Sequence, residues 1–401
     1  MNPTIEREQQ YCAHNYLPLP VVLVKGQGVH VWDDQGRRYL DMMSAYSAVS
    51  HGHSHPRLVA TLSRQASQLA IVSRAFYTDK LAPFLEQACR MTGQAMALPM
   101  NTGAEAVETA LKAARKWAYT VKGVPTDRAE VLVCDGNFHG RTISIVGFSS
   151  EAQYKADFGP YPEGFIAVPF GDVDALEAAI TPNTAAFLLE PIQGEGGIIV
   201  PPTGYLKKVA KICSDNNVLL ICDEIQTGLG RTGKLLASDH EAVRPDGLIL
   251  GKALGGGLLP VSLFLARREV MEVFQPGDHG STFGGNPLSA AVALEGLKLL
   301  EEEGLIEAAA EMGDYFMAAL GELDSPLIKE VRGKGLLIGV EIDPERAAAR
   351  RVCEQLMSHG VLSKETHDTV VRFAPPLIIT REQIDATVGA LRQVLAELAR
   401  D

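Results

Sequence analysis

The chain has 401 residues, which allows two or three domains and a core of the size found in enzymes. Apolar residues make up 46% and charged residues 21%, close to the averages for soluble globular proteins, so an ordered body is expected. Lys and Arg number 37 against 49 Asp and Glu, and a net charge of −12 repels phosphate backbones and anionic membranes. We therefore expect neither nucleic acid nor a membrane as a partner.

The cysteines and the N-terminal segment indicate a reducing compartment. Six cysteines are scattered without a Cys-x-x-Cys pair, a pattern that favours reduced, mostly buried thiols over a disulfide or zinc framework. The segment MNPTIEREQQYCAHNY carries acids and lacks the apolar core of a signal peptide. No window of 18 apolar residues is present, so no membrane-spanning helix is expected. Together these features predict a cytoplasmic protein.

The order of strands and helices predicts an α/β fold. Residues 21–24, 29–32 and 37–40 are short extended pieces of an antiparallel meander, with DDQG as a turn between the last two. From about residue 47, amphipathic helices alternate with continuous apolar runs, which are typical of parallel strands covered on both faces. These runs are EVLVC (130–134), FIAVPF (165–170), AAFLLEP (185–191), VLLICDE (218–224), LILGK (248–252) and VSLFLA (261–266).

The C-terminal part begins with helical segments after residue 305, followed by a strand at 336–342 and a last helix at about 381–399. We predict a large domain with a mostly parallel central sheet and a small α+β domain built from both chain ends. The expected division is 1–46 and 301–401 for the small domain and 47–300 for the large one.

One glycine-rich segment, GLGRTG (228–233), matches the dinucleotide fingerprint G-x-G-x-x-G and follows a strand. Five residues, DEIQT, separate that strand from the first glycine, however, and the sequence KLLASDHEA that follows begins a helix poorly. GLGRTGK also nearly matches the phosphate-binding loop, but Leu235 stands where a hydroxyl would bind magnesium. An ordinary loop and a nucleotide-dependent oxidoreductase remain as alternatives.

A second segment, NTGAEAVETALKAARKWAYTV (101–121), predicts a helix that begins at Gly103. Thr102 and Glu105 form a capping-box pattern, and apolar residues recur at helical spacing behind them. The first amides of such a helix are free to bind an anion. A capped helix without a ligand is the simpler interpretation of this segment alone.

The lysine of LILGKALGGG (248–257) favours a ligand site over a simple capped helix. Lys252 follows a buried strand directly, at the edge where open α/β sheets bind ligands. Partial burial would lower its pKa and supply the neutral amine that a Schiff base requires. The neighbouring strand ends in Asp223, whose carboxylate could pair with a protonated pyridine nitrogen. Lysine, aspartate and an anion-binding helix together indicate pyridoxal 5′-phosphate.

Three histidines in HGHSHP (51–56) could suggest a metal, but no acid or thiolate lies near them in the sequence. We expect no metal site.

Six motifs resemble those of the class III aminotransferases of fold type I, in family order and over nearly the whole chain. Within that family the ornithine δ-aminotransferase group is the most similar, on the residues HNYLPLP (14–20), SRAFY (73–77) and VRFAPP (371–376). The six family motifs are NTGAEA (101–106), NFHGRT (137–142), EPIQGEGG (190–197), CDEIQTGLGRTG (222–233), LGKALGGG (250–257) and STFGGNP (281–287).

The resemblance implies roles at the cofactor ring. Lys252 would be the Schiff-base lysine and proton shuttle, and Asp223 the partner of the pyridine nitrogen. Gln226 would donate a hydrogen bond to the ring phenolate, and Phe138 would stack on the ring.

The resemblance also implies how the phosphate is bound. Gly103 and Ala104 would bind it through backbone amides, and Ser281 and Thr282 would reach the phosphate of the neighbouring subunit. The expected assembly is therefore a homodimer whose active site is shared between subunits.

Substrate-binding roles are implied for five further residues. Tyr16 and Arg141 would hold the α-carboxylate of ornithine, so that its δ-amine faces the cofactor, and Tyr77 would shape the pocket. Arg372 would pair with Glu195, which masks the arginine for ornithine and releases it for 2-oxoglutarate.

The implied activity is transfer of the δ-amino group of L-ornithine to 2-oxoglutarate, giving glutamate 5-semialdehyde and glutamate by a ping-pong mechanism. Its partners are thus small amino acids and 2-oxo acids. A sibling enzyme acting on N-acetylornithine or 4-aminobutyrate is the alternative. His139 does not help to choose, because some ornithine enzymes carry Trp at this place and acetylornithine enzymes commonly carry His.

Overall fold

The central element of the computed structural model, which describes residues 2–400, is a seven-stranded sheet in the order β4-β10-β9-β8-β7-β5-β6. The five strands from β9 to β6 are parallel, and β10 and β4 add an antiparallel edge, which confirms the predicted mostly parallel sheet. The strands are β4 (Met96–Met100), β5 (Glu130–Cys134), β6 (Phe165–Val168), β7 (Thr184–Leu189), β8 (Leu219–Asp223), β9 (Gly247–Leu250) and β10 (Ser262–Ala266).

The strands are apolar on both faces because each face of the sheet has its own core cluster. Along β5, Val131 and Val133 pack on the side of Trp117, whereas Leu132 and Cys134 belong to the cluster on the opposite face. Side chains alternate across a strand, so an uninterrupted apolar run serves both layers. β4 was not predicted from the sequence, because its run MALPM contains a proline and is only partly buried.

Fourteen α-helices surround the sheets in the part of the chain described. They are α1 (Pro3–Tyr11), α2 (Ser44–Ser47), α3 (Pro56–Gln68), α4 (Leu81–Thr92), α5 (Gly103–Trp117), α6 (Ile143–Gly147), α7 (Ala152–Lys155), α8 (Val173–Ala179), α9 (Tyr205–Asp215), α10 (Arg268–Met271), α11 (Pro287–Glu302), α12 (Leu305–Gly321), α13 (Ala349–Ser358) and α14 (Arg381–Leu398). A π-helix, η1 (Ala118–Lys122), and two 3₁₀ helices, η2 (Ala237–Glu241) and η3 (Lys252–Gly255), complete the set.

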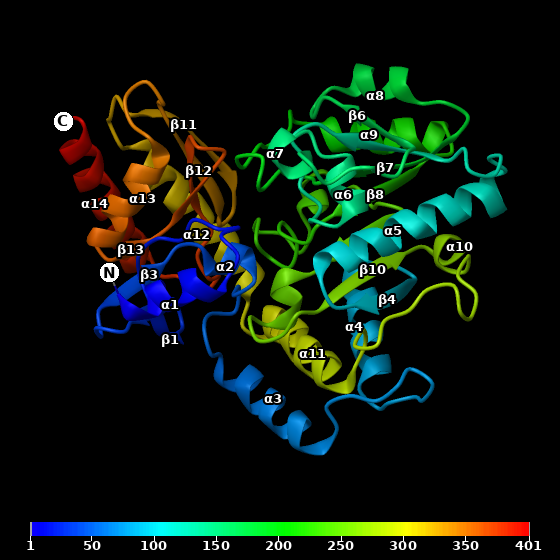
Figure 1. Ribbon diagram of the computed structural model, residues 1–401, viewed down its shortest axis with the longest axis horizontal. Coiled ribbons are helices and arrows are strands. Elements are labelled where there is room, and N and C mark those ends of the chain that lie inside the picture. The colour runs from blue at the N-terminus through cyan, green and yellow to red at the C-terminus, as the bar shows by residue number, and fades with distance from the viewer. Residues whose placement is uncertain (1, 401) are drawn as a thin grey trace.

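The two chain ends meet in a pair of four-stranded sheets, on the left of Figure 1. The predicted N-terminal meander is present, and the C-terminal strand β13 pairs with β3 in parallel. The other sheet has the order β11-β12-β15-β14. The division of the chain at residues 46 and 300 stays a prediction. The strands are β1 (Leu23–Gln27), β2 (His30–Asp33), β3 (Arg38–Asp41), β11 (Ile328–Lys334), β12 (Leu337–Ile342), β13 (Val361–Leu362), β14 (Lys364–Thr366) and β15 (Val370–Phe373).

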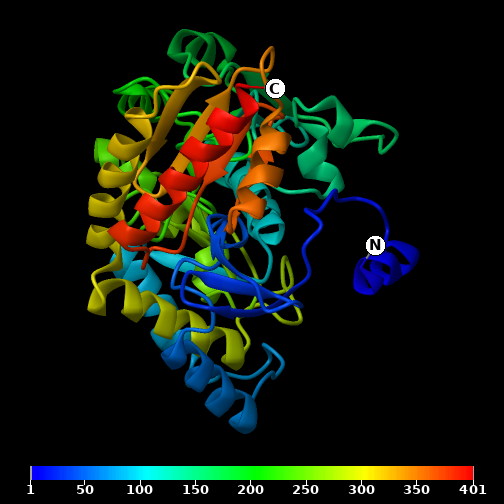
Figure 2. The ribbon, with the colours of Figure 1, turned by 90° about the vertical axis from the view of Figure 1, so that its left-hand side faces the viewer.

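Helix α1 has no buried residue and stands apart from the rest of the chain in Figure 2. No helix among residues 2–400 is long and apolar enough to cross a membrane. The six cysteines are free, and four of them are buried. The histidines of HGHSHP have separate partners: His51 contacts the carbonyl of Gly296, His53 pairs with Asp41, and His55 pairs with Glu303.

The GLGRTG segment is a structural junction rather than a nucleotide-binding turn. It leads through further turns into the short 3₁₀ helix η2, so no α-helix begins there to bind a pyrophosphate. The guanidinium of Arg231 is fully buried and donates to the carbonyls of Leu336 and Pro375 and to the hydroxyls of Ser44 and Ser50. One side chain thereby joins the N-terminal segment, the central part and the C-terminal part.

Replacing Arg231 tests this junction. Arg231→Met should lower the free energy of unfolding by about 3–5 kcal/mol, because it leaves buried acceptors without a donor. Arg128→Met, at an exposed position, is the control and should change it by less than about 0.5 kcal/mol. Urea unfolding measures both, and equal stabilities of the two variants would contradict the role given to Arg231.

Candidate active site

The candidate site is a cavity of about 210 Å³ next to the carboxyl ends of β8 and β9. Ligands of open α/β sheets bind at such an edge because loops, and not strands, line it. Two of the predicted residues stand at these ends: Asp223 is the last residue of β8, and Lys252 follows β9 by two residues. The lining residues are Gly103, Ala104, Phe138, His139, Gly140, Glu190, Glu195, Asp223, Ile225, Gln226, Thr227 and Lys252.

Lys252 is held in an unusual backbone conformation at this cavity. Its φ is +44°, which is uncommon for a residue with a side chain and is maintained by the surrounding fold. Burial lowers the pKa of Lys252, and the charge of Arg372 adds to this effect, although Glu195 and Asp223 oppose it. A larger share of neutral amine is therefore available than on a surface lysine, as nucleophilic or proton-transfer chemistry requires.

Asp223 is buried and paired with a residue that the sequence did not assign to it. Nδ1 of His139 lies 2.7 Å from Oδ2 of Asp223, and the backbone N–H of Ile225 donates to Oδ1. Burial disfavours protonation of His139, but the hydrogen bond to Asp223 outweighs it and raises the histidine pKa. The carboxylate is thus oriented from two sides.

A second charged pair joins the cavity to the C-terminal sheet. Glu195 accepts from NH1 of Arg372 at 2.5 Å and from Nε2 of Gln226 at 3.1 Å. Burial opposes ionisation of Glu195, but Arg372 and Lys252 outweigh it and lower its pKa to about 2. The Arg372 side chain is only 1% exposed, so its charge is neutralised almost entirely by this glutamate.

The aromatic ring of Tyr46 lies against the other side of the same arginine, with Cζ of Arg372 5.0 Å from the ring centroid. Tyr46 sits in α2, where four successive residues have left-handed φ values, from +40° at Ser44 to +74° at Ser47. Burial raises the pKa of Tyr46, and the charges of Glu195 and Tyr16 add to it. Sequence patterns gave no signal for this residue, because such a turn without glycine is rare.

Glu190, at the end of β7, is a further buried acid at the cavity. Its carboxylate accepts from the backbone N–H of Phe138 at 3.0 Å and of Gly194 at 3.3 Å, so it joins the loops that carry Phe138 and Glu195. Burial raises the pKa of Glu190 to about 7; Asp223 adds to the shift and His139 opposes it. The motif EPIQGEGG contained this glutamate, but only its buried surroundings distinguish it.

The part of the cavity that Gly103 and Ala104 line is suited to an anion. The predicted capping box is confirmed, since Thr102 and Glu105 exchange hydrogen bonds and α5 begins at Gly103. The amides at the start of α5 are therefore directed at the space beside Gly103 and Ala104. Gly140, with φ +131°, passes so close to Ala104 that a Cβ there would lie 2.9 Å from the Ala104 Cβ.

The remaining predicted residues lie outside this cavity within one chain. Ser281 and Thr282 line a separate hollow with residues 71–74, and Asn101 donates to the Ser281 hydroxyl. Arg141 stacks on Tyr154, with its Cζ 3.6 Å from the ring centroid, and lies 5.5 Å from the ring of Phe138. Within one chain, Ser281, Thr282 and Arg141 therefore do not line the cavity that holds Lys252.

Two tyrosines predicted at the substrate are exposed in the single chain. Tyr16 is 73% exposed, although it is near enough to affect the pKa of Tyr46. Tyr77 is completely exposed, so the single chain does not bring it to Lys252. Gln226 directs its amide nitrogen at Glu195, and its Oε1 is buried without a partner among the described residues.

A cavity lined by a buried amine, a paired aspartate and a helix N-terminus, at the strand ends of an α/β sheet, is typical of an enzyme active site. A family model described as "Aminotransferase class-III" matches residues 11–395. The ornithine aminotransferase of Brevibacillus brevis is 56% identical over 394 residues, covering 98% of both chains. The chain therefore belongs to the class III aminotransferases, a family of pyridoxal-phosphate-dependent enzymes with fold type I.

Two solved structures extend the comparison. An ornithine aminotransferase of Toxoplasma gondii is 46% identical with a TM-score of 0.97, covering 99% of this chain and 96% of that one. An acetylornithine aminotransferase of Elizabethkingia anophelis is also 46% identical, with a TM-score of 0.89 and 98% of both chains covered. This chain is thus similar to members of two substrate groups.

The buried carboxyl of Glu190 generates a pH-dependent prediction. Its pKa is raised on folding, so the unfolded chain releases the proton first and stability falls as the pH rises from about 4.5 to about 7. The stability of the wild type relative to Glu190→Gln should decrease by about 3 kcal/mol over this interval. Urea unfolding at several pH values measures it. Glu177→Gln, at an exposed site, should show no such trend; a constant difference for Glu190→Gln would refute the prediction.

Proposed function

We propose that this enzyme transfers the δ-amino group of L-ornithine to 2-oxoglutarate, giving glutamate 5-semialdehyde and glutamate by a ping-pong mechanism. The observation that carries the proposal is the ion pair of Glu195 and Arg372 beside Lys252. Neutralised in this way, Arg372 does not attract the α-carboxylate of ornithine toward the lysine. The 56% identity to a bacterial ornithine aminotransferase supports the same substrate.

The residues of the cavity fit pyridoxal 5′-phosphate. Asp223 can pair with a protonated ring nitrogen, Gly103 and Ala104 offer amides to a phosphate, and Phe138 offers a ring face. Oε1 of Gln226 and Nε2 of His139 are buried and lack partners among residues 2–400, as expected of polar groups that face a ligand. When bound, the cofactor supplies an electron sink and carries the amino group between the two half-reactions.

Lys252 is the residue that holds and moves the proton. Burial favours its neutral amine, which accepts a proton from the carbon that loses hydrogen and returns it at a neighbouring position. Glu195 and Asp223 stabilise the protonated lysine that exists between these two steps. Its strained backbone, at the first residue of η3 and close behind β9, keeps the amine in one place for both transfers.

The ornithine α-carboxylate binds at the far end of the site, at Arg141 and Tyr16. Arg141 lies beside Phe138, so a carboxylate on this guanidinium directs an extended chain along the ring position toward Lys252. Stacking on Tyr154 orients the guanidinium. Tyr16, on the N-terminal segment, lies near Tyr46 and so close to Arg372. We assign Tyr77 to the substrate pocket of the assembled dimer.

Arg372 binds the α-carboxylate of the second substrate once Glu195 has moved away. Glu195 accepts a hydrogen bond from Gln226 as well, so an alternative partner is already in reach. Nε of Arg372 is buried without a partner among the described residues and is available to an incoming acid. The same pocket thus accommodates a monocarboxylate diamine in one half-reaction and a dicarboxylate in the other.

Two copies of the chain form the working enzyme. Exposed apolar side chains lie in, or within three residues along the chain of, the segments that line the hollow of Ser281 and Thr282. Exposed apolar surface of this kind often marks a protein–protein interface. Pairing there would cover them, and the hydroxyls of Ser281 and Thr282 would help to hold the phosphate in the other copy. The exposed residues are Leu69, Ile71, Phe76, Tyr77 and Phe283.

Transfer from N-acetylornithine or 4-aminobutyrate is the second candidate function, which the similarity to an acetylornithine aminotransferase favours. Ornithine and 2-oxoglutarate should give a semialdehyde that cyclises and can be trapped, and no product should form from N-acetylornithine. Turnover of N-acetylornithine alone would replace the first proposal by the second.

Lys252→Ala should lower turnover of ornithine by roughly 10²–10⁴-fold, because the proton carrier is lost. The purified wild type should show a visible absorption band that borohydride removes. When the borohydride carries an isotopic label, that label should be found on the peptide that contains Lys252. Lys208→Ala, on the exposed face of α9, is the matched control and should retain full turnover. Labelling of another lysine would refute the assignment.

Glu195→Ala should free Arg372 and raise α-amino transfer from glutamate relative to δ-transfer from ornithine by roughly tenfold. The initial rates of the two half-reactions, followed separately by absorbance, give this ratio. Glu195→Gln removes only the charge and should shift the ratio in the same direction. An unchanged ratio in both variants would refute the masking role.

A further inference from the structure

Residues 193–199 form a tight turn that carries Glu195 at its tip. Gln193 and Ile199 close the turn through two backbone hydrogen bonds, of 3.1 and 2.9 Å. Behind the tip, Gly197 has a φ of +110° and Ile198 a φ of +56°. Such a backbone is strained at Ile198 and persists only where its surroundings hold it.

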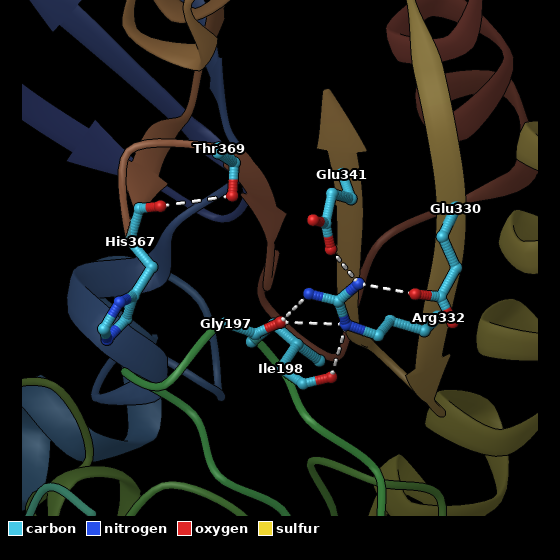
Figure 3. A network of polar contacts seen from close by, with 7 residues as sticks. All are labelled: Gly197, Ile198, Glu330, Arg332, Glu341, His367 and Thr369. Carbon is cyan, nitrogen blue, oxygen red and sulfur yellow. Dashed lines mark hydrogen bonds and ion pairs between the residues drawn. The ribbon is translucent and has the colours of Figure 1, made fainter. Parts of the chain in front are cut away.

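Arg332 of β11 binds the base of this turn, as Figure 3 shows. Its Nε donates to the carbonyls of Gly197 at 3.0 Å and Ile198 at 3.2 Å, and NH2 donates to Gly197 at 2.7 Å. The two carbonyls therefore converge on one guanidinium. The planar fork of arginine can bind them together, which a lysine cannot do.

The charge of Arg332 is compensated within its own sheet. NH1 pairs with Glu330 and Glu341, and the side chain is only 12% exposed. Nε, NH1 and NH2 thus all have acceptors, so this arginine is not available to bind a substrate carboxylate. Its contacts instead end on the backbone of the turn.

Two other residues of the same sheet hold the tip. The hydroxyl of Thr366, in β14, donates to the backbone carbonyl of Glu195 at 2.7 Å, and Arg372, in β15, binds the Glu195 side chain. Three residues of one sheet therefore hold the turn: Arg332 at its base, Thr366 at the backbone of Glu195 and Arg372 at the Glu195 carboxylate. The position of Glu195 relative to Arg372 depends on all three.

We propose that Arg332 is a positioning residue for substrate selectivity: it holds the 193–199 turn so that Glu195 rests against Arg372 when ornithine binds. This inference rests on the proposed masking of Arg372. Without Arg332 the turn relaxes and Glu195 leaves Arg372 more often. Arg372 is then free to bind the α-carboxylate of ornithine, which directs the α-amine instead of the δ-amine at Lys252. Arg332 acts through Glu195 and does not touch the substrate.

The test compares Arg332→Met, Arg332→Lys and the control Lys329→Met, an exposed position of the same strand, in the cofactor-loaded enzyme. Arg332→Met should lower the ratio of δ-transfer from ornithine to α-transfer from glutamate several-fold, less than Glu195→Ala does. Arg332→Lys restores one donor and should bring the ratio part of the way back to the wild-type value, whereas Lys329→Met should leave it unchanged. Hydrogen exchange of the peptide that contains residues 193–199 is measured in parallel and should accelerate in Arg332→Met.

Two results would overturn the proposal. The first is hydrogen exchange of the 193–199 peptide that is unchanged in Arg332→Met. The second is faster exchange in Arg332→Met without a change in the ratio of δ- to α-transfer, although Glu195→Ala does change that ratio. If Arg332→Met does not fold, Thr366→Val replaces it: removing one hydroxyl should lower the ratio several-fold, and an unaltered ratio would overturn the inference. An unchanged ratio in Glu195→Ala refutes the masking role itself, while accelerated exchange in Arg332→Met still supports Arg332 as the support of the turn.

Discussion

The ion pair of Glu195 and Arg372 is the interaction on which the rest of the site depends. Arg372 is almost completely buried, and a buried guanidinium without a counter-charge would be too costly to keep in the folded state. The glutamate stands on a turn of the central part, and the arginine stands on the C-terminal sheet. One contact therefore joins two parts of the fold and neutralises a buried charge next to the cavity that Lys252 lines.

The neighbouring polar groups form a connected set around this pair. Glu190 holds the amides of Phe138 and Gly194, and Gln226 holds Glu195 from the other side. His139 fixes Asp223 at the end of β8. Glu190, Gln226, His139 and Asp223 are buried, so loss of one partner leaves a charge or a dipole unpaired in a medium of low dielectric constant.

The sequence predicted those features that local chemistry determines. The start of α5 follows from Thr102 and Glu105, and the continuous run of β5 follows from burial on both faces. Lys252 and Asp223 line one cavity because Asp223 ends β8 and Lys252 follows the adjacent parallel strand β9. The left-handed turn at Tyr46 and the pairing of His139 with Asp223 depend on residues far apart in the chain, and no local pattern encodes them. The contacts of Arg332 are of the same kind, since they join β11 to a turn more than a hundred residues earlier.

Isotope labelling of the transferred nitrogen tests the central claim most directly. Ornithine labelled with ¹⁵N at either the δ-amine or the α-amine is incubated with 2-oxoglutarate and the wild-type enzyme, and the glutamate formed is examined by mass spectrometry. If Glu195 masks Arg372 while ornithine binds, glutamate acquires label from the δ-position and almost none from the α-position. A substantial share of α-label in glutamate would contradict the account.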